Sequence, residues 1–342
     1  MMIDAIYAPH LRLDAPPEVP KMMRAAAIER FGGPEMLAIH SVPVPVPGPR
    51  EVLIAIDTAG VGGWDADMRE GWSPGGRPKF PLILGTDGSG WITAVGSQVR
   101  RLRPGDAVYA YSFDNPKGGF YAEYAAVAAH QVAPLPEGLD MRAAGGLATT
   151  GLTALQGIDQ ALQVKPADTV LILGASGGVG TLAVQFARLR GARVLAVASG
   201  DDGVALARNL GADKAIDGRR QDICAAVRQF APGGVDAALV LGGSQAMDKC
   251  IDLIRSSGRL AYPNGVEPEP KKRRGVHIVP YDAVAGLKEF ASLNRAVTAA
   301  RLRAPIAASY PLEQVAEAHR RLAAGRVLGK IVLRVRRMNS NT

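Results

Sequence analysis

Cysteine is almost absent from this chain, with only Cys224 and Cys250 among 342 residues. Two cysteines cannot build a disulfide framework, and there is no Cys-x-x-Cys pair from which a four-thiolate zinc site could form. The chain has no run of about 18 apolar residues, and its first residues lack the uninterrupted apolar stretch of a signal peptide. We therefore expect a protein of the reducing cytoplasm that neither crosses a membrane nor is secreted.

Charged residues are also scarce, at 21%, whereas 47% of the residues are hydrophobic. That balance excludes intrinsic disorder, and the length predicts two domains. Lys and Arg outnumber Asp and Glu by 40 to 32, for a net charge of +8. These basic residues are scattered, and the densest run, residues 271–274, has Pro and Glu on its N-terminal side, as in a loop. We interpret it as solvated surface rather than as a nucleic-acid site.

Turn-forming residues divide the chain into two differently patterned parts. Proline and glycine recur every several residues up to about residue 140, which indicates a β-rich domain. From about residue 150, apolar runs of strand length alternate with helical periodicity, which predicts an α/β fold with a doubly wound parallel sheet. Strands are expected at 169–173, 193–198, 214–216, 235–240 and 259–262, with helices at 178–190, 203–210, 220–230 and 245–256. Two more helical patterns, 282–302 and 312–324, precede a closing strand at 329–333.

A glycine-rich loop with the sequence GASGGVG lies between the first of these strands and the first helix. Glycines in such a turn let the backbone approach a pyrophosphate closely, and the free N–H groups of the following helix stabilise its charge. The loop lacks the Gly-Lys-Ser/Thr ending of a P-loop. In its setting of strand, turn, helix and second strand it predicts a dinucleotide site made by Gly174, Ala175, Ser176, Gly177, Gly178, Val179 and Gly180.

The end of the second strand separates NAD from NADP, because a carboxylate there binds the ribose 2′-hydroxyl and repels a 2′-phosphate. Here that end reads Ala-Ser-Gly at 198–200, and no acid occurs before the aspartate pair at 201–202. We therefore favour NADPH, with Ser199, Gly200 and Arg219 near the 2′-phosphate. NADH stays open as the less favoured cofactor, because the two aspartates are close and no Lys or Arg immediately follows Ser199.

Seven segments occur in a fixed order: 90–108 (GWITAVGSQVRRLRPGDAV), 119–124 (GFYAEY), 135–139 (LPEGL), 150–154 (TGLTA), 174–180, 210–213 (LGAD) and 329–333 (GKIVL). Together they resemble the medium-chain dehydrogenase/reductase superfamily, in its zinc-lacking quinone oxidoreductase and enoyl reductase branch. The resemblance implies a GroES-like β-barrel catalytic domain, a Rossmann domain and an active site in the cleft between them.

The same resemblance sets the expected domain boundaries. The catalytic domain would comprise residues 23–145 and 283–342, because the end of the chain returns to it in this family. The Rossmann domain would comprise residues 146–282. Independently of the resemblance, we expect residues 1–22 to be a disordered extension or a misassigned start, because Met22 and Met23 immediately precede the first well-patterned segment. The resemblance also implies a homodimer.

Zinc-dependent members of the superfamily have a Cys after an Ala-Gly-Val type segment and a His in a Gly-His-Glu run. In this chain Gly62 and Thr86 stand at those two positions. Neither side chain coordinates zinc usefully, and the five histidines show no paired spacing. We therefore expect no zinc and no other metal, and regard zinc-type alcohol oxidation as the less favoured chemistry.

Without a metal to polarise a carbonyl, reduction of a conjugated acceptor is the less demanding reaction, because negative charge spreads over the acceptor. We therefore expect an NADPH-dependent, zinc-independent oxidoreductase that transfers hydride to a quinone or an α,β-unsaturated carbonyl. The alternative is a non-enzymatic NADPH-binding redox sensor or an RNA-associated protein. It stays open because the Asn and Tyr that relatives carry at Gly62 and near Asp67 are missing here.

The catalytic residues are unassigned at this level. Trp64 and Asp65 are substrate-pocket candidates because the resemblance places their turn beside the nicotinamide, and Tyr111 and Tyr121 because aromatic side chains suit a conjugated acceptor. Asp87 is interpreted as a structural hydrogen-bonding residue rather than a base, and Lys330 as a solvated lysine, with contact to a cofactor phosphate as the alternative. For the nicotinamide half of the cofactor, the resemblance points to Thr150, Gly242, Gly243, Pro263, Asn264 and Gly265.

Overall fold

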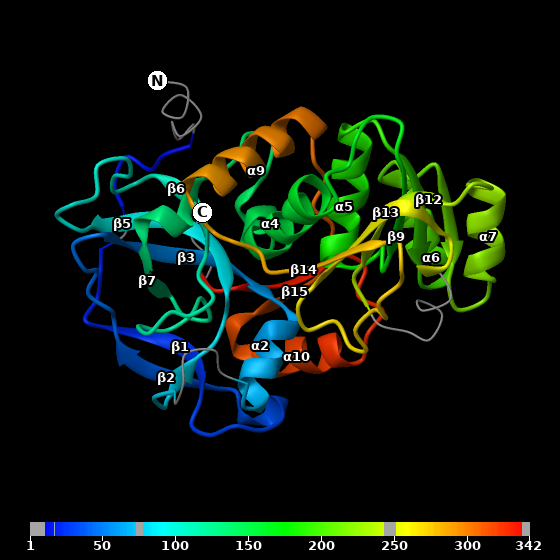
Figure 1. Ribbon diagram of the computed structural model, residues 1–342. Coiled ribbons are helices and arrows are strands. Elements are labelled where there is room, and N and C mark those ends of the chain that lie inside the picture. Colours follow the sequence, from blue (N-terminus) through cyan, green and yellow to red (C-terminus); the bar gives the residue numbers. More distant parts are fainter. Residues whose placement is uncertain (1–10, 17, 73–77, 243–250, 337–342) are drawn as a thin grey trace.

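The computed structural model describes residues 11–16, 18–72, 78–242 and 251–336, which form an antiparallel β lobe and a parallel α/β lobe (Figure 1). In the β lobe, a seven-stranded sheet has the order β15-β16-β3-β5-β6-β8, with β7 paired to β3. Its strands are β3 (Glu51–Val61), β5 (Asp87–Val95), β6 (Ala107–Tyr111), β7 (Tyr124–Ala128), β8 (Val132–Pro134), β15 (Ile306–Pro311) and β16 (Lys330–Arg334).

Smaller elements complete the β lobe. A three-stranded sheet has the order β2-β1-β4, with β1 at Met22–Ile28, β2 at Ala38–Pro43 and β4 at Leu82–Ile83. Helix α2 (Gly63–Glu70) directly follows β3, and α10 (Val315–Ala323) lies between β15 and β16 in sequence. Because β16 pairs antiparallel with β3, the end of the described chain lies in the same sheet as its first half.

The second lobe contains six parallel strands in the order β11-β10-β9-β12-β13-β14. Counted along the chain this order is 3-2-1-4-5-6, that of doubly wound dinucleotide-binding sheets. The strands are β9 (Thr169–Leu173), β10 (Arg193–Ala198), β11 (Lys214–Asp217), β12 (Val235–Val240), β13 (Ile254–Pro263) and β14 (His277–Tyr281), and the helices between them are α5 (Gly178–Leu189), α6 (Gly200–Asn209) and α7 (Ile223–Phe230).

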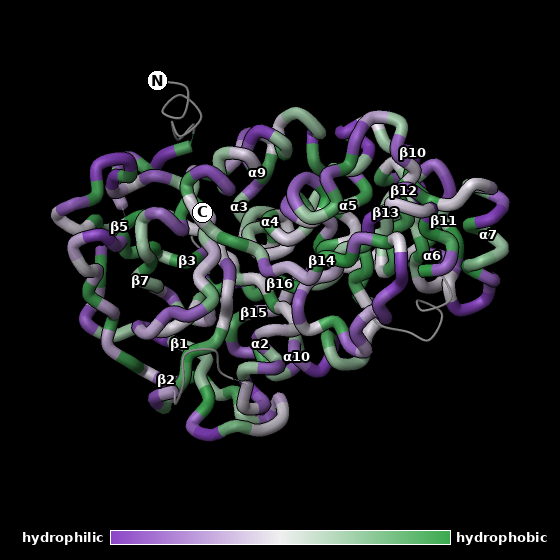
Figure 2. The backbone as a smooth tube through the Cα atoms, viewed as in Figure 1, coloured by the Kyte–Doolittle hydropathy of each residue, from purple (hydrophilic) through white to green (hydrophobic). Residues whose placement is uncertain are grey.

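The interior of this sheet is fully buried, as near-continuous apolar strands predict. Every residue of β9 and β12 is buried, and hydrophobic colouring marks the interior of the lobe in Figure 2. Asp236 is the charged exception in these two strands, and its carboxylate accepts a hydrogen bond from the Thr169 N–H at 2.7 Å. No helix in the described parts of the chain is long and apolar enough to cross a membrane.

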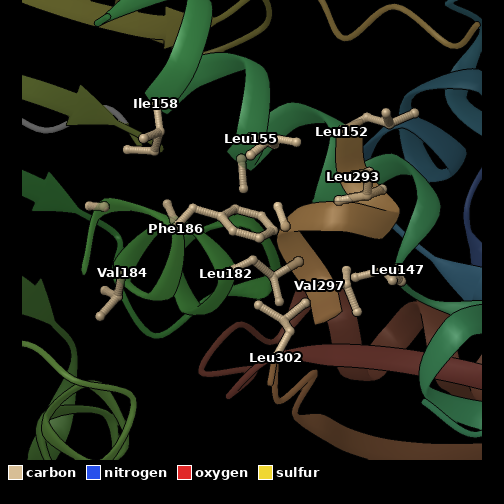
Figure 3. Packing of buried hydrophobic residues seen from close by; sticks show 14 of the residues in the cluster. Leu147, Leu152, Leu155, Ile158, Leu182, Val184, Phe186, Leu293, Val297 and Leu302 are labelled. Atoms are coloured by element: carbon tan, nitrogen blue, oxygen red, sulfur yellow. The ribbon is translucent and has the colours of Figure 1, made fainter. Parts of the chain in front are cut away.

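A helical layer joins the lobes. Helix α4 (Ala148–Gln156) follows the short α3 (Met141–Gly145), and both α4 and α5 pack against α9 (Leu287–Ala300). Phe186 and Leu182 of α5 meet Leu152 of α4 and Leu293 and Val297 of α9 in one hydrophobic cluster (Figure 3). This cluster fixes α4, which follows the β lobe in sequence, against the helix that begins at the glycine-rich loop.

The observed elements differ from the expected ones in three places. Half of the helix expected at 245–256, residues 245–250, lies outside the described residues, and residues 254–256 belong to β13 because pairing with β12 overrides the helical pattern. Strands β14 and β15 were not expected. The segment taken as a disordered extension contacts the β lobe from Leu11 on, since Leu13 donates to the Gly105 carbonyl and Ala107 donates to the Leu11 carbonyl.

Candidate active site

The glycine-rich loop has a packed inner side and an open outer side. A Cβ on Gly180 would overlap the Gly174 carbonyl oxygen, whereas a Cβ on Gly177 would meet only that oxygen, at 3.5 Å. Gly177 caps α5 and has no side chain, so no capping side chain satisfies the N–H groups of the first turn, which lack partners within the helix. This cradle of free N–H groups fits the pyrophosphate of a dinucleotide.

Both lobes contact this loop. A Cβ on Gly178 would lie 3.2 Å from Cγ2 of Thr150, so α4 passes close beside the loop. On another side, the N–H of Gly329 donates to the Ser176 carbonyl at 2.9 Å, immediately before β16 begins. The predicted residues Thr150 and Ser176 therefore lie where the two lobes meet.

A cavity of about 230 Å³ opens beside the end of β10. Arg220 is held in it by Asp201 at 3.1 Å and by Asp217 at 3.5 Å. Among the described residues, no hydrogen bond or ion pair engages the guanidinium of Arg219 or Arg326. The lining residues include the predicted Ser199, Gly200 and Arg219, and in full are Ser199, Gly200, Asp201, Asp202, Asp217, Arg219, Arg220, Arg326 and Leu328.

The other predicted cofactor residues are spread along the sheet edge. Asn264 donates to Asp282 at 2.7 Å, and Pro263 pairs with Tyr281. A Cβ on Gly265 would lie 3.3 Å from Cη2 of Trp64, so this turn faces α2 of the other lobe. Gly242 is exposed, and no atom of the described residues lies within 4 Å of a Cβ placed on it. Gly243 lies outside the described residues.

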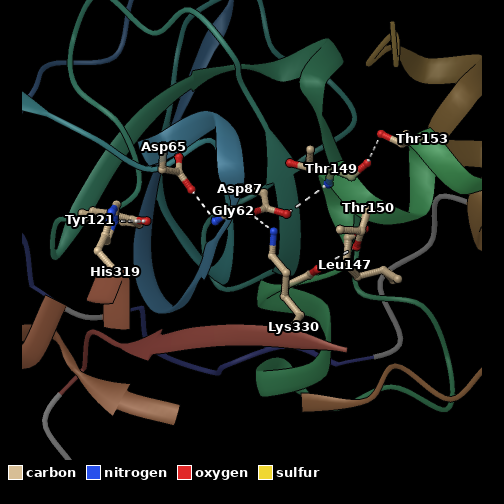
Figure 4. Close-up of polar contacts among 11 residues, drawn as sticks. Gly62, Asp65, Asp87, Tyr121, Leu147, Thr149, Thr150, Thr153, His319 and Lys330 are labelled. Carbon is tan, nitrogen blue, oxygen red and sulfur yellow. Dashed lines mark hydrogen bonds and ion pairs between the residues drawn. The ribbon is translucent and has the colours of Figure 1, made fainter. Parts of the chain in front are cut away.

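A buried polar cluster lies at the start of α2 (Figure 4). Asp65 and Asp87 are both completely buried. Asp65 accepts the Gly62 N–H at 2.8 Å, and Asp87 accepts the Thr149 N–H at 3.1 Å. The ammonium of Lys330 lies 3.9 Å from Oδ1 of Asp87.

Lys330 is 8% exposed, so its interpretation as a solvated lysine is wrong. The ammonium enters the interior because carboxylates there offset part of its desolvation cost. Asp87 supplies the nearest of them, on strand β5.

Burial and charge determine the protonation of this cluster. Burial raises the pKa of Asp65 and the charge of Asp87 adds to the rise, whereas Lys330 and the Gly62 N–H oppose it, which leaves the pKa at about 6. Tyr111, opposite Asp87 in the sheet, has a raised pKa because it is buried near these carboxylates. Asp65 therefore titrates close to neutral pH while Tyr111 stays protonated.

Tyr121 and His319 link this cluster to the interior of the β lobe. Nη1 of Arg69 lies 2.7 Å from Nδ1 of His319, and Nε2 of His319 lies 3.1 Å from the Tyr121 hydroxyl. Burial first, and then the charge of Arg69, lowers the pKa of His319 to about 3. Because arginine only donates, the neutral imidazole accepts at Nδ1 and donates from Nε2. Tyr121 is fully buried beside Asp65, so it is a core residue rather than an exposed pocket wall.

Three aromatic rings lie together beside α2: Trp64 is in its first turn, and Trp72 follows its end. The centroids of Trp64 and Trp72 are 5.2 Å apart, and each lies 5.4 Å from that of Phe113. We call Trp64, Trp72 and Phe113 the aromatic cluster. Trp72 is 44% exposed, so the cluster forms a rim that incoming molecules can contact. Tyr111, the remaining predicted pocket residue, is half-buried two residues before Phe113.

The positions at which zinc-dependent members carry metal ligands offer few ligands in this chain. Gly62 has no side chain, and Thr86 is a buried hydroxyl residue. Within the described ranges, no group of three or more His, Cys, Asp or Glu side chains could hold a metal ion.

A dinucleotide cradle on a doubly wound sheet, facing a polar cluster on a second lobe, defines a two-domain oxidoreductase that uses a nicotinamide cofactor. Residues 48–137 match the family described as alcohol dehydrogenase GroES-like domain, and residues 210–333 match the family described as zinc-binding dehydrogenase. The chain belongs to the medium-chain dehydrogenase/reductase superfamily, and the fold predicted from the sequence is confirmed.

Individual relatives agree with this assignment. A human quinone oxidoreductase is 30% identical over 326 residues, which cover 92% of this chain and 98% of the relative. A solved NAD-dependent alcohol dehydrogenase has a TM-score of 0.85 at 32% identity, covering 92% of this chain and all of the other. A mycobacterial protein solved in complex with NADPH has a TM-score of 0.80 at 27% identity, with the same two coverages.

Sequence reasoning missed Arg69, His319 and Arg326, and it did not predict that Lys330 and Asp87 lie together. Arg69 and His319 are 250 residues apart, and Lys330 and Asp87 lie on different strands. Arg326 follows α10 and reaches the β10 cavity only through the fold. The one sequence signal for any of them was Lys330, whose position opens the GKIVL segment of the resemblance.

Proposed function

We propose that the protein is an NADPH-dependent, zinc-independent oxidoreductase that transfers hydride to a quinone or an α,β-unsaturated carbonyl. One observation carries the proposal: the dinucleotide loop is intact, whereas Gly62 and Thr86 offer no thiolate or imidazole to a catalytic zinc. A conjugated acceptor needs less electrophilic assistance than an isolated carbonyl, because its own π system carries the developing charge.

The preference for NADPH is supported by the charges around the β10 cavity. Arg220 engages Asp201 and Asp217, which leaves the guanidinium groups of Arg219 and Arg326 available to a 2′-phosphate. No acidic side chain ends β10 itself, where Ser199 stands. The similar mycobacterial protein that was solved with NADPH supports the same preference.

The residues that would hold NADPH are the loop from Gly174 to Gly180 for the pyrophosphate and the β10 cavity for the adenosine end. Thr150 and Gly265 stand nearer the polar cluster, where the nicotinamide half would reach the acceptor. When bound, NADPH supplies the hydride.

The chain's own groups then supply orientation and a proton. Trp64 and its aromatic partners offer flat faces against which a conjugated acceptor can pack. The raised pKa of Asp65 keeps a substantial fraction of this carboxyl protonated near pH 6, so it is the proposed proton store of the site. For the assembly and the compartment, we retain the homodimer and the cytoplasm as proposals.

The sensor and RNA-associated alternatives gain no support. In the basic run, Arg273 is engaged by the Ile254 carbonyl at 3.1 Å and by Asp252 at 3.5 Å. This arginine is therefore committed to contacts within the chain, which disfavours the run as an RNA-binding patch.

The test is NADPH oxidation by chelator-treated protein, with 1,4-naphthoquinone and trans-2-hexenal as acceptors and NADH run in parallel. We expect turnover with NADPH and weaker turnover with NADH, and the better acceptor places the protein on the quinone or the enoyl branch. Binding of NADPH without turnover of either acceptor would contradict the enzymatic proposal and favour the sensor.

A further inference from the structure

Lys330 lies in a channel of small residues that brings its ammonium into the polar cluster. A Cβ on Gly146 would lie 2.7 Å from Cγ of Lys330, and a Cβ on Gly178 would lie 3.7 Å from its Cδ. The stem of the lysine therefore passes between α3 and the dinucleotide loop. It needs the absence of a side chain at Gly146.

The end of the side chain is held beside Gly62. Its ammonium lies 3.9 Å from Oδ1 of Asp87, and a Cβ on Gly62 would lie 3.2 Å from the same nitrogen. Asp87 is itself fixed by the Thr149 N–H, and its Oδ1 accepts no hydrogen bond from the described residues. A Cβ on Gly60 would overlap this oxygen, so only glycine leaves room for it.

Gly62 is the position at which the resemblance places a zinc ligand in zinc-dependent members. In this chain a side chain at that position would approach an ammonium instead. An acceptor oxygen that occupied the space left by the missing side chain would lie within hydrogen-bonding distance of Nζ. Asp87, completely buried, faces this ammonium and offsets part of the cost of burying it.

We propose that the Lys330 ammonium is the fixed cation that stabilises negative charge on the acceptor oxygen, with Asp87 as its positioning residue. The inference rests on the proposed function and adds the group that replaces metal assistance. Hydride that NADPH would supply to the β-carbon of an enone would shift the C=C π pair into a new double bond between the α-carbon and the carbonyl carbon, and the C=O π pair would come to rest on the oxygen beside Lys330. NADP⁺ is the other product, and a proton from Asp65 or water completes the reduction.

The central variant is Lys330→Met, compared with Lys330→Arg and with Lys288→Met, the same substitution at an exposed position of α9. We expect Lys330→Met to lower kcat by about 100-fold at saturating NADPH, as for loss of one preorganised charge-stabilising group. Lys330→Arg should recover part of the loss, and Lys288→Met should match the parent. A loss of NADPH affinity with kcat unchanged would overturn the proposal, because Lys330 would then serve the cofactor.

A binding experiment decides the same question without turnover. The probe is 4-nitrophenol, whose visible absorbance reports its ionisation, titrated against the protein saturated with NADP⁺. We expect the bound probe to ionise about one pH unit lower on the parent protein than on Lys330→Met, a tenfold change in its ionisation constant. Equal ionisation on the two proteins would overturn the assignment of Lys330, even if the parent reduces quinones. If the parent reduces no acceptor but shows the shift, the proposed function fails and the cation site stands.

Discussion

The two halves of the site are built in different ways. The pyrophosphate cradle of the cofactor half comes from one continuous stretch, in which β9, the glycine loop and α5 follow each other over about twenty residues. The acceptor half is assembled from α2, β5, the segment before β7, α10 and β16, whose residues lie as far apart in the chain as Asp65 and Lys330. The first half is held by backbone geometry, and the second by buried charges that only the complete fold brings together.

Because the two halves are built differently, different changes should disrupt them. Backbone packing in the loop tolerates no added atom on its inner side, whereas the polar cluster depends on pairs of side chains and on pH. Substitutions can therefore damage one half while sparing the other.

The largest expected effect is that of Gly180→Ala, which attacks the cofactor half. The new Cβ would overlap the Gly174 carbonyl oxygen, so the loop must shift. We expect a loss of stability of about 3 kcal/mol and an NADPH affinity lowered by roughly 100-fold or more, measured by thermal unfolding and by cofactor fluorescence. Gly177→Ala is the matched control for stability, since its Cβ would meet only an atom at 3.5 Å. Equal stability losses in the two variants would refute the packed inner side.

The pH dependence of stability probes the acceptor half. The lowered pKa of His319 means that the unfolded chain binds a proton near pH 6.5 while the folded chain does so only near pH 3. This residue's contribution is therefore present above pH 6.5 and lost as the pH falls toward 3. We expect His319→Gln to remove that acid sensitivity, on the order of a few kcal/mol, in denaturant titrations at several pH values.

Asp65 acts in the opposite direction, because its raised pKa makes stability fall as the pH rises from about 4 to about 6. Asp65 is present in the parent and in His319→Gln, so its contribution cancels in the difference between their free energies of unfolding. His130→Gln, at an exposed turn, is the matched control. If the stabilities of His319→Gln and His130→Gln depend on pH in the same way, the assignment of His319 as a buried neutral imidazole is wrong.

Within the cofactor half, the preference for NADPH over NADH tests which arginine binds the 2′-phosphate. We expect Arg219→Ala to weaken NADPH binding by about 10- to 100-fold, the value of a hydrogen bond to a charged group, and to leave NADH binding unchanged. Arg220→Ala is the neighbouring control, because Asp201 and Asp217 already engage its guanidinium. A larger loss in Arg220→Ala than in Arg219→Ala would reverse the assignment of the 2′-phosphate partner.

The smallest effect is expected at the aromatic rim. Trp72→Leu should raise the KM of a two-ring quinone by about 2- to 10-fold, since an aromatic contact contributes about 0.5–1.5 kcal/mol. The KM of a short aliphatic enone should change less. Trp91→Leu provides a tryptophan control outside the aromatic cluster, because Trp91 packs beneath the Arg336 guanidinium. An unchanged quinone KM in Trp72→Leu would remove the aromatic cluster from the acceptor site.

The two halves also differed in how far the sequence predicted them. The loop from Gly174 to Gly180 and the strand end at Ser199 were readable because their geometry depends on adjacent residues. Gly60 and Gly62 had no comparable signal, since the atoms they make room for belong to Asp87 and Lys330.

Tyr121 and Lys330 show why the acceptor half of the site could not be predicted from the sequence. An aromatic residue suits a pocket and a lysine suits solvent, and only tertiary contacts with His319 and Asp87 change those defaults. The closing strand was predicted, whereas β14 and β15 were not; they take their places by pairing with β13 and β16.

The most direct test of the central claim is a single turnover of the metal-free protein with NADPH deuterated at the transferred position of C4. We predict that reduction of the acceptor is slower with the deuterated cofactor and that neither chelator nor added zinc changes its rate. Turnover that disappears on chelation and returns with zinc would contradict the account.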